Sequence, residues 1–286
     1  MRIALVGARG QLGAALGHEL AGGHDTVAFG RAELDISDAA AVAAAMARVE
    51  PDVILNAAAF TNVDAAEDRP IDALNGNAFG VRALARAARL QGAALIHYSS
   101  DFVFDGRAST PYTEADPPNP QNVYAASKLL GEWFARDTPR GYVLRVEALF
   151  GQAPGADPPK SSAATILNTL KAGDSPRVFV DRTITPTYIM DVARATRQLV
   201  ESKAPAGLYH CVNSGQCTWL EFGREMARLL GLEPRLTPVR MSDVPMRAAR
   251  PLYCALSNDK LRSIGIEMPS WQDALARSLR AHPSGR

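Results

Sequence analysis

The chain has 286 residues, of which 47% are hydrophobic and 21% charged, and its formal net charge is +1. This composition is ordinary for a soluble globular protein of one large or two unequal domains. The near-neutral charge gives no general attraction to nucleic acid or anionic lipid, and no window approaches the roughly 18 apolar residues of a membrane span, so we expect no nucleic-acid or membrane partner.

The cysteine and histidine content predicts neither a disulfide framework nor a metal site. The three cysteines, Cys211, Cys217 and Cys254, are widely spaced, and the five histidines lack metal-ligand spacing. The N-terminal stretch MRIALVGARGQLG has an apolar run too short for a signal peptide. We therefore expect a cytoplasmic protein.

Short apolar runs alternate with alanine-rich helical stretches over the first half of the chain. Such a pattern predicts a parallel sheet covered by helices on both faces, a doubly wound α/β architecture whose ligand lies beyond the C-terminal ends of the strands. The expected strands are 2–7, 25–30, 52–59, 93–100 and 141–150, and the expected helices are 11–22, 38–50, 72–92 and one that begins near residue 122.

The character of the sequence changes after residue 150. Residues 151–162, GQAPGADPPKSS, form a Pro/Gly-rich loop that is typical of a domain boundary or a mobile lid. We expect the residues beyond it to form a smaller α/β domain that faces the substrate. Its expected elements are helices near 163–172, 188–202 and 218–230, strands at 177–180 and 207–212, and a loop-rich tail.

A glycine-rich turn with the spacing G-x-x-G-x-x-G follows the first strand and opens the first helix. Glycine permits a tight turn and lets backbone N–H groups approach a pyrophosphate, whose charge is favourable at a helix N-terminus. A plain strand-to-helix turn is the alternative, but the position at the first βα turn favours a dinucleotide site. The residues expected to contact the cofactor here are Gly7, Arg9, Gly10, Gln11 and Leu12, with Gly13 completing the turn.

The residues after the second strand bear on the choice between NAD and NADP. An acidic residue there binds the ribose hydroxyls of NAD, whereas arginine accommodates the 2′-phosphate of NADP. Arg31 ends this strand and Arg9 lies in the glycine turn, which favours NADPH and leaves NADH possible; solvated surface arginines are the alternative. We expect Asp35 and Ile36 to flank the adenine. The small residues that end the third strand leave room for the cofactor: Ala57, Ala58 and Ala59.

Three side chains predict a carbonyl reduction. Ser100 lies at the tip of the fourth main strand, and Tyr124 and Lys128 lie one turn apart on the next helix. A Tyr-x-x-x-Lys match alone also fits an ordinary amphipathic helix. Hydride transfer to a ketone, however, leaves an alkoxide that needs a proton donor, a role that suits Tyr124 when Lys128 stabilises its phenolate and also contacts the nicotinamide ribose. Ser100 would orient the carbonyl oxygen.

Longer motifs make a specific resemblance. GxxGQLG, LDISD, VILNAAAFTNVDAAE, SSDFVFDG, NVYAASKLLGE and RPLYCALSNDKL resemble the dTDP-4-dehydrorhamnose reductase family over essentially the whole chain. That family belongs to the extended short-chain dehydrogenase/reductases and is Rossmann-like in fold. The resemblance implies reduction of the 4-keto group of dTDP-6-deoxy-L-lyxo-4-hexulose by NAD(P)H, which yields dTDP-L-rhamnose.

The resemblance also implies a division of the chain and a set of sugar-side residues. We expect residues 1–150, joined by about 181–203, to form the NAD(P)-binding Rossmann domain, and residues 151–286 to form most of the nucleotide-sugar domain. Arg250 would face the nucleotide diphosphate. The residues expected to border the sugar are Thr61, Val63, Asp101 and Phe102.

Several substrate-side positions depart from the family's usual pattern. Glu147 and Ala148 stand where serine and tryptophan are common, Arg182 stands where glutamine is usual, and Ile184 where glycine is frequent. The reaction type is therefore better supported than the sugar. Some relatives bind Mg²⁺ at a dimer contact through a glutamate after the glycine turn; Ala15 is the corresponding residue here, so we expect no such metal and a monomer or weak homodimer.

Two alternatives stay open at this point. One is a reductase or epimerase of another nucleotide sugar, although an epimerase needs a further acid/base and no second candidate stands out. The other is a non-catalytic, NADP-binding regulatory relative, of which one subunit of methionine adenosyltransferase is an example. The presence of Ser100, Tyr124 and Lys128 favours an enzyme.

Overall fold

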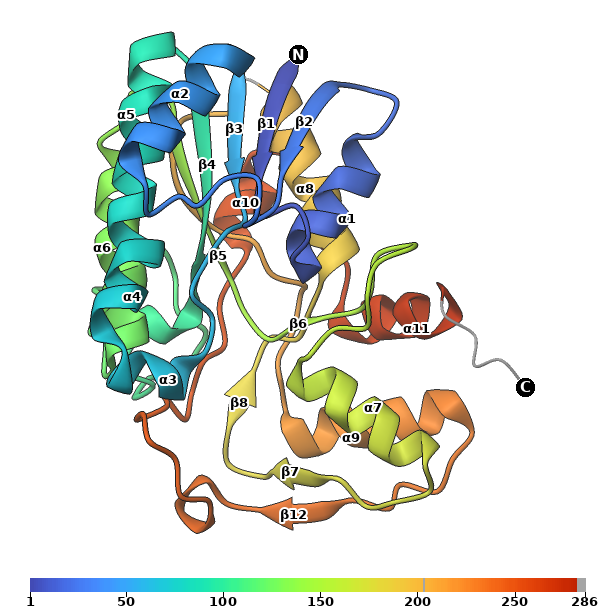
Figure 1. Cartoon of the computed structure of the whole chain (residues 1–286). Helices are drawn as coiled ribbons and strands as arrows, with labels where there is room; N and C mark the ends of the chain where they lie inside the picture. Colours follow the sequence, from blue (N-terminus) through green and yellow to red (C-terminus); the bar gives the residue numbers. More distant parts are fainter. Residues whose placement is uncertain (203, 282–286) are drawn as a thin grey trace.

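A six-stranded parallel sheet forms the centre of the computed structural model, which describes residues 1–202 and 204–281 (Figure 1). Its apolar strands are covered on both faces, which is why they lack the alternation of a half-exposed strand. In spatial order the strands are β10 (Gly207–His210), β5 (Gly141–Val146), β4 (Ala94–Ser100), β3 (Val53–Asn56), β1 (Arg2–Val6) and β2 (Asp25–Phe29).

Helices cover both faces of this sheet and create two apolar cores (Figure 1). On one face, α1 (Gln11–Leu20) packs against α8 (Ile189–Glu201). On the other face lie α2 (Ala39–Val49), α5 (Gly80–Gln91) and α6 (Val123–Arg136). The expected doubly wound α/β fold is confirmed, and it sets the tips of β1, β3 and β4 at one edge, where a ligand binds in such folds.

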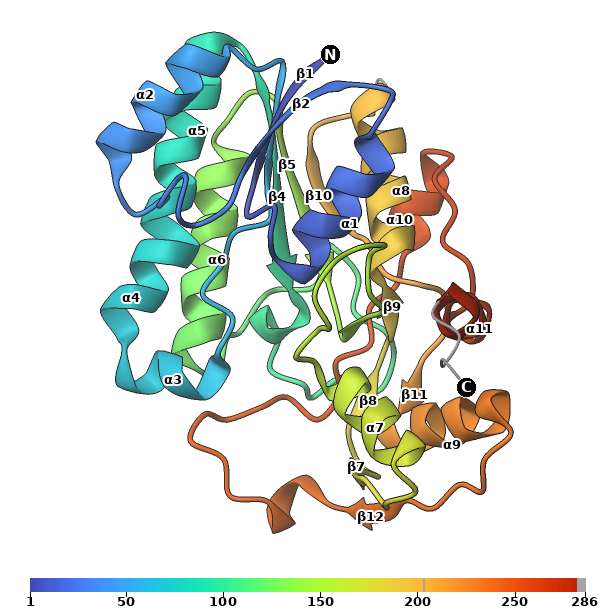
Figure 2. The same ribbon diagram turned by 45° about the vertical axis from the view of Figure 1, so that its right-hand side comes forward.

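The region beyond the sheet is built from short elements around the larger of the two cores (Figure 2). The helices α7 (Ser162–Lys171) and α9 (Trp219–Leu230) pack beside two small pairs of strands: β7 (Arg177–Phe179) with β12 (Thr237–Val239), and β8 (Thr183–Ile184) with β11 (Cys217–Thr218). The expected loop-rich tail, residues 233–251, contains the short strand β12, and two helices follow it, α10 (Asp259–Ser263) and α11 (Trp271–Ala281).

Two expected elements of the first half are divided in the structure. The helix expected over 72–92 consists of α4 (Pro70–Leu74), a π-helical turn (Asn75–Phe79) and α5, and a further helix, α3 (Val63–Asp68), precedes it. The strand expected over 141–150 is interrupted where Ala148 adopts a left-handed φ of 40°. Beyond this residue the chain forms β6 (Leu149–Phe150), which pairs with β9 (Thr187–Tyr188) outside the main sheet.

The second half of the chain also contributes to the main sheet. Helix α8 covers one face of the sheet and is followed directly by β10, which pairs with β5. The chain therefore crosses between the two regions more than once (Figure 2). Within the described residues, no helix is both long enough and apolar enough to cross a membrane.

Candidate active site

The glycine turn has the geometry that a pyrophosphate needs. Gly7 has a φ of +78°, which disfavours any residue with a Cβ atom. A Cβ on Gly13 would lie 2.1 Å from the Gly7 carbonyl oxygen, so helix α1 comes as close to the turn as backbone atoms allow. The N-cap residue Gly10 has no side chain to cap the helix. The first N–H groups of α1 are therefore available to an anion.

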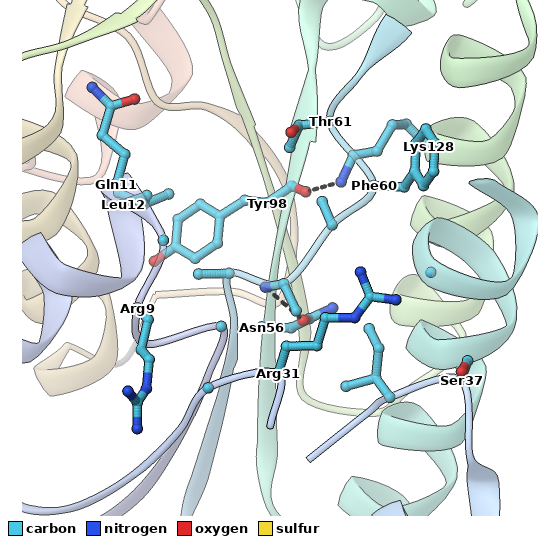
Figure 3. Close-up of a pocket in the computed structure, with 18 of the residues that line it drawn as sticks. Arg9, Gln11, Leu12, Arg31, Ser37, Asn56, Phe60, Thr61, Tyr98 and Lys128 are labelled. Atoms are coloured by element: carbon cyan, nitrogen blue, oxygen red, sulfur yellow. Dashed lines mark hydrogen bonds between the residues drawn. The ribbon is translucent and has the colours of Figure 1, made fainter. Parts of the chain in front are cut away.

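A cleft of about 710 Å³ opens at the strand tips beside this turn (Figure 3). Every residue expected to contact the cofactor lines it, and Thr61 from the expected sugar side joins them. Sequence reasoning missed several further lining residues, among them Asn56, Tyr98 and Lys160. The sequence could have indicated Lys160, because it is the single cation of the Pro/Gly-rich loop. Nothing in the sequence indicated Tyr98, which belongs to a buried strand.

Charged side chains of both signs lie at the end of the cleft next to β2. Arg31 lines the cleft and its side chain is directed into it, as Figure 3 shows. Arg9 forms an ion pair with Glu33 close to Gly30. Ser37 donates to Asp35 at 2.7 Å from its hydroxyl and at 2.9 Å from its backbone N–H, and these bonds lower the pKa of Asp35.

Ser100 and Tyr124 are set by the local structure at the ends of their elements. Ser100 ends β4 and caps a single 3₁₀ turn, where its hydroxyl donates to Asp101 Oδ1 at 2.8 Å and accepts from the Phe102 N–H at 3.2 Å. Helix α6 begins with Asn122, whose side chain accepts the Ala125 N–H at 2.7 Å. This cap places Tyr124 in the first turn of α6, facing the strand tips.

Burial shifts the pKa values of the acid and its expected partner in opposite directions. It raises the pKa of Tyr124 to about 12, assisted by the negative charge of Asp101 and opposed by the bond to Ser100. It lowers the pKa of Lys128 to about 8, although the charge of Glu132 acts against this. The pKa of Tyr124 is therefore raised, and not lowered as stabilisation of its phenolate by Lys128 would require. The Lys128 ammonium is directed to the Tyr98 carbonyl oxygen at 2.5 Å (Figure 3).

The π-helical turn packs against α6 and is joined to it by a side-chain hydrogen bond. Asn77 lies in this turn, and its side-chain amide donates to Ser127 Oγ at 3.0 Å and to the Phe60 carbonyl oxygen at 3.0 Å. Its Oδ1 accepts the Phe60 N–H at 2.8 Å. A Cβ on Gly131 would lie 2.2 Å from the Asn77 carbonyl oxygen, so the two segments pack backbone to backbone. One amide therefore fixes α6 relative to the loop that carries Thr61.

A buried ion pair lies one turn beyond Lys128. Glu132 and Arg145 form two parallel bonds of 2.8 Å, and both side chains are at most 2% exposed. The Arg145 guanidinium also stacks over Phe104, 4.8 Å from the ring centroid. This pair joins α6 to β5 behind the cleft.

The residues that we expect on the sugar side are spread over several places in the structure. Phe102 contacts Tyr124 edge to face, with ring centroids 5.7 Å apart, and Asp101 is buried behind Ser100. Val63 opens helix α3. Arg250 forms two bonds of 2.9 and 2.7 Å with Asp64, so its contact with a diphosphate stays a prediction in which the phosphates compete with a carboxylate.

The chain is similar to known proteins along nearly its whole length. The family model described as RmlD substrate binding domain matches residues 1–283. A dTDP-4-dehydrorhamnose reductase from Streptomyces griseus is 37% identical, with 97% of this chain and 92% of that protein covered. The crystal structure of a dTDP-4-dehydrorhamnose reductase from Clostridium acetobutylicum has a TM-score of 0.92 at 33% identity, and covers 98% of this chain and 99% of its own. One from Bacillus anthracis, solved with NADP, has a TM-score of 0.91 at 32% identity, with 98% and 99% covered.

Proposed function

Because this chain belongs to the RmlD substrate binding domain family, we propose that it is an NADPH-dependent reductase of a dTDP-4-keto-6-deoxy sugar, dTDP-4-dehydrorhamnose in the first place, and that its product is dTDP-L-rhamnose. The observation that carries the proposal is the presence of Tyr124 and Lys128 together in the lining of the cleft beside the glycine turn. The chain matches reductases of this sugar along nearly its whole length.

The residues present fit a nicotinamide dinucleotide. The free N–H groups of α1 and the turn at Gly7 suit the pyrophosphate, and Arg31 suits a 2′-phosphate. When bound, the cofactor supplies the hydride that converts the ketone to an alcohol. NADH, which lacks the 2′-phosphate, fits the same cleft without using Arg31.

The chain's own groups handle the proton. Tyr124 holds its proton over the whole physiological range, so it is ready to donate to the oxygen that becomes an alkoxide. Ser100 orients the same oxygen through its hydroxyl. The Lys128 ammonium stabilises the negative charge left on Tyr124, and it retains N–H donors for a ribose hydroxyl besides the one given to Tyr98.

We also assign the two regions of the chain different tasks. The sheet with α8 and β10 would bind the cofactor, and most of the remainder after residue 150 would bind the nucleotide sugar, with a monomer or weak homodimer as the working assembly. The sugar side would include Thr61, Val63, Asp101 and Phe102, and Arg250 would lie by the diphosphate.

The direct test is NADPH oxidation in the presence of dTDP-4-dehydrorhamnose, with the product identified by mass spectrometry and NMR. We expect turnover and formation of dTDP-L-rhamnose. A protein that binds NADPH but turns over no 4-keto sugar would instead be a regulatory relative. Turnover of a different 4-keto sugar alone would keep the reaction and change the substrate.

Replacement of Arg31 by alanine is expected to distinguish the two cofactors. The substitution removes a cation that only the 2′-phosphate of NADPH uses, so the KM for NADPH should rise by about tenfold or more and the KM for NADH should change little. Steady-state kinetics with each cofactor measure this. Arg228→Met, at an exposed position on α9, is the control for loss of a surface arginine. Equal effects on the two cofactors would remove Arg31 from the 2′-phosphate site.

The activity is expected to fall as the pH rises through about 8. Burial holds the pKa of Lys128 near 8, below its ordinary value of 10.5, so the ammonium loses its charge above that pH while Tyr124, with a pKa of about 12, stays protonated. A profile of kcat/KM between about pH 6 and 10 should show this basic limb. NADPH binding, followed by fluorescence over the same range, separates loss of chemistry from loss of the cofactor. A profile that stays flat to pH 10 would contradict the role of Lys128.

A further inference from the structure

A buried cluster of charged side chains lies behind the expected sugar site. Asp101, Glu147 and Cys254 bring one ligand-type atom each within 4.8 Å of one another, and Arg182 is in the same cluster. Ser100 connects the cluster to the catalytic residues through its 2.8 Å bond to Asp101. Glu147 is fixed by the Thr185 N–H, which donates to its Oε2 at 2.8 Å. The cation that faces these carboxyl groups is thus a guanidinium of the chain itself.

The guanidinium of Arg182 has far fewer partners than its burial requires. It offers five N–H donors, and its side chain is only 12% exposed. Among the described residues it makes one hydrogen bond, of 3.6 Å, to the thiol sulfur of Cys254, which is a weak acceptor. The nearest Asp101 oxygen is 4.0 Å away, and the buried Nε of Arg182 has no partner. An unsatisfied buried donor of this kind is costly, so it points to an acceptor that a ligand provides.

The position of Arg182 relates it to the reacting centre. Its guanidinium carbon lies 5.1 Å from the ring centroid of Phe102, and the same ring meets Tyr124 edge to face. One aromatic ring therefore separates Arg182 from the acid. A sugar whose 4-keto oxygen lies at Tyr124 would extend over Phe102 toward Arg182.

The charge balance of the cluster restricts the chemistry of the acceptor. Two carboxyl groups, Asp101 and Glu147, face one guanidinium, and burial raises the pKa of both acids. The raised pKa values favour the neutral acids, and Asp101 Oδ2 and Glu147 Oε1 are buried without a partner in the described part of the chain, beside the unpaired Nε of Arg182. A sugar hydroxyl, which can both accept and donate, suits this set of atoms and brings no further negative charge into a buried site.

We propose, resting on the reductase function above, that Arg182 is a specificity-determining residue that donates hydrogen bonds to a ring hydroxyl of the neutral sugar, while Asp101 and Glu147 hold the guanidinium in place. The enzyme accordingly selects 4-keto-6-deoxy sugars that keep this hydroxyl over analogues deoxygenated at C2 or C3. A buried site built to bond a hydroxyl rejects the analogue that lacks it, because its own donor is then left unpaired.

The test pairs changes in the enzyme with changes in the substrate. The kcat/KM of the wild type and of Arg182→Met is measured with dTDP-4-dehydrorhamnose and with its 2-deoxy and 3-deoxy analogues. We expect the wild type to discriminate against one of the two analogues by about 100-fold or more in kcat/KM. In Arg182→Met, kcat/KM for dTDP-4-dehydrorhamnose should fall while kcat/KM for that analogue stays nearly the same, so most of the discrimination is lost. Arg182→Gln, which retains an amide donor, should recover part of it, and Arg228→Met is the matched control.

Two results would overturn the proposal. One is unchanged discrimination against both analogues in Arg182→Met, and the other is an equal loss on all three sugars accompanied by a lowered Tm. Binding of dTDP-L-rhamnose to the NADP-loaded protein, followed by calorimetry, separates this proposal from the proposed function. If the wild type turns over no 4-keto sugar but binds dTDP-L-rhamnose at least tenfold more tightly than Arg182→Met does, the reductase function fails and the role of Arg182 stands.

Discussion

Replacement of Tyr124 by phenylalanine should lower kcat by about 10³-fold, since a positioned general acid typically contributes 10²–10⁴. The change deletes one oxygen and leaves the edge-to-face contact with Phe102 in place. The alkoxide would then have no proton donor at hydrogen-bonding distance, although Ser100 could still orient it. NADPH oxidation with dTDP-4-dehydrorhamnose measures the loss, and the affinity for NADPH and the Tm should stay close to the wild-type values.

Tyr142→Phe is the matched control for this experiment. Tyr142 lies on β5, and its hydroxyl donates to the Ala204 carbonyl oxygen at 2.8 Å, away from the residues assigned to catalysis. Its replacement also deletes a hydrogen-bonded phenol oxygen. It therefore reproduces any loss of stability while it leaves the expected proton donor, Tyr124, in place. A Tyr124→Phe enzyme that retained more than about a tenth of the wild-type kcat would show that another group, or water, protonates the product.

Replacement of Arg145 by methionine should lower the free energy of unfolding by about 3–5 kcal/mol, which is the usual cost when one partner of a buried ion pair is removed. The carboxylate of Glu132 is only 1% exposed and would lose both of its bonds to Arg145. Denaturant unfolding measures the change. The double variant Glu132→Gln with Arg145→Met should recover part of the loss, because it leaves no unpaired charge; a loss below about 1 kcal/mol in the single variant would contradict the argument.

The same substitution should also move the pH profile of the enzyme. Glu132 is four residues beyond Lys128 on α6, and its negative charge raises the pKa of Lys128. Without Arg145 to neutralise it, the carboxylate acts on Lys128 more strongly, so the basic limb of kcat/KM should shift to higher pH. A shift to lower pH would mean that the loss of the pair acts through the fold and not through charge.

The elements that the sequence predicted well are those with a strong local signal. The strands of the main sheet are continuously apolar, and the glycine turn needs residues without a Cβ atom, so both could be located without the structure. The residues proposed for catalysis were chosen from their places at a strand tip and a helix start. The short pairs β8–β11 and β7–β12 were missed, in whole or in part, because two- and three-residue strands hold together by contacts distant in sequence.

Sequence reasoning was weakest where function depends on which side chains meet. Arg250 was expected beside a diphosphate, and nothing local indicated that Asp64, far away in the sequence, would pair with it. The π-helical turn at Asn75–Phe79 was read as part of one continuous helix, because a single extra residue per turn does not change the apolar pattern visibly. Glu147 and Arg182 were noted as departures, but only the fold brings them into one cluster.

The pairing of β10 with β5 has a consequence for how the protein is made. On the ribosome, all the proposed catalytic residues have been synthesised by residue 128, yet the edge of β5 stays open until Gly207–His210 arrives. At about 5–20 residues per second, the chain between the two strands takes roughly 3 to 12 seconds to be added. During that interval a buried-type strand has its unpaired edge exposed, which is a template for association with other nascent chains. Nascent chains on neighbouring ribosomes of one messenger RNA could therefore misassemble through this edge until β10 pairs with β5.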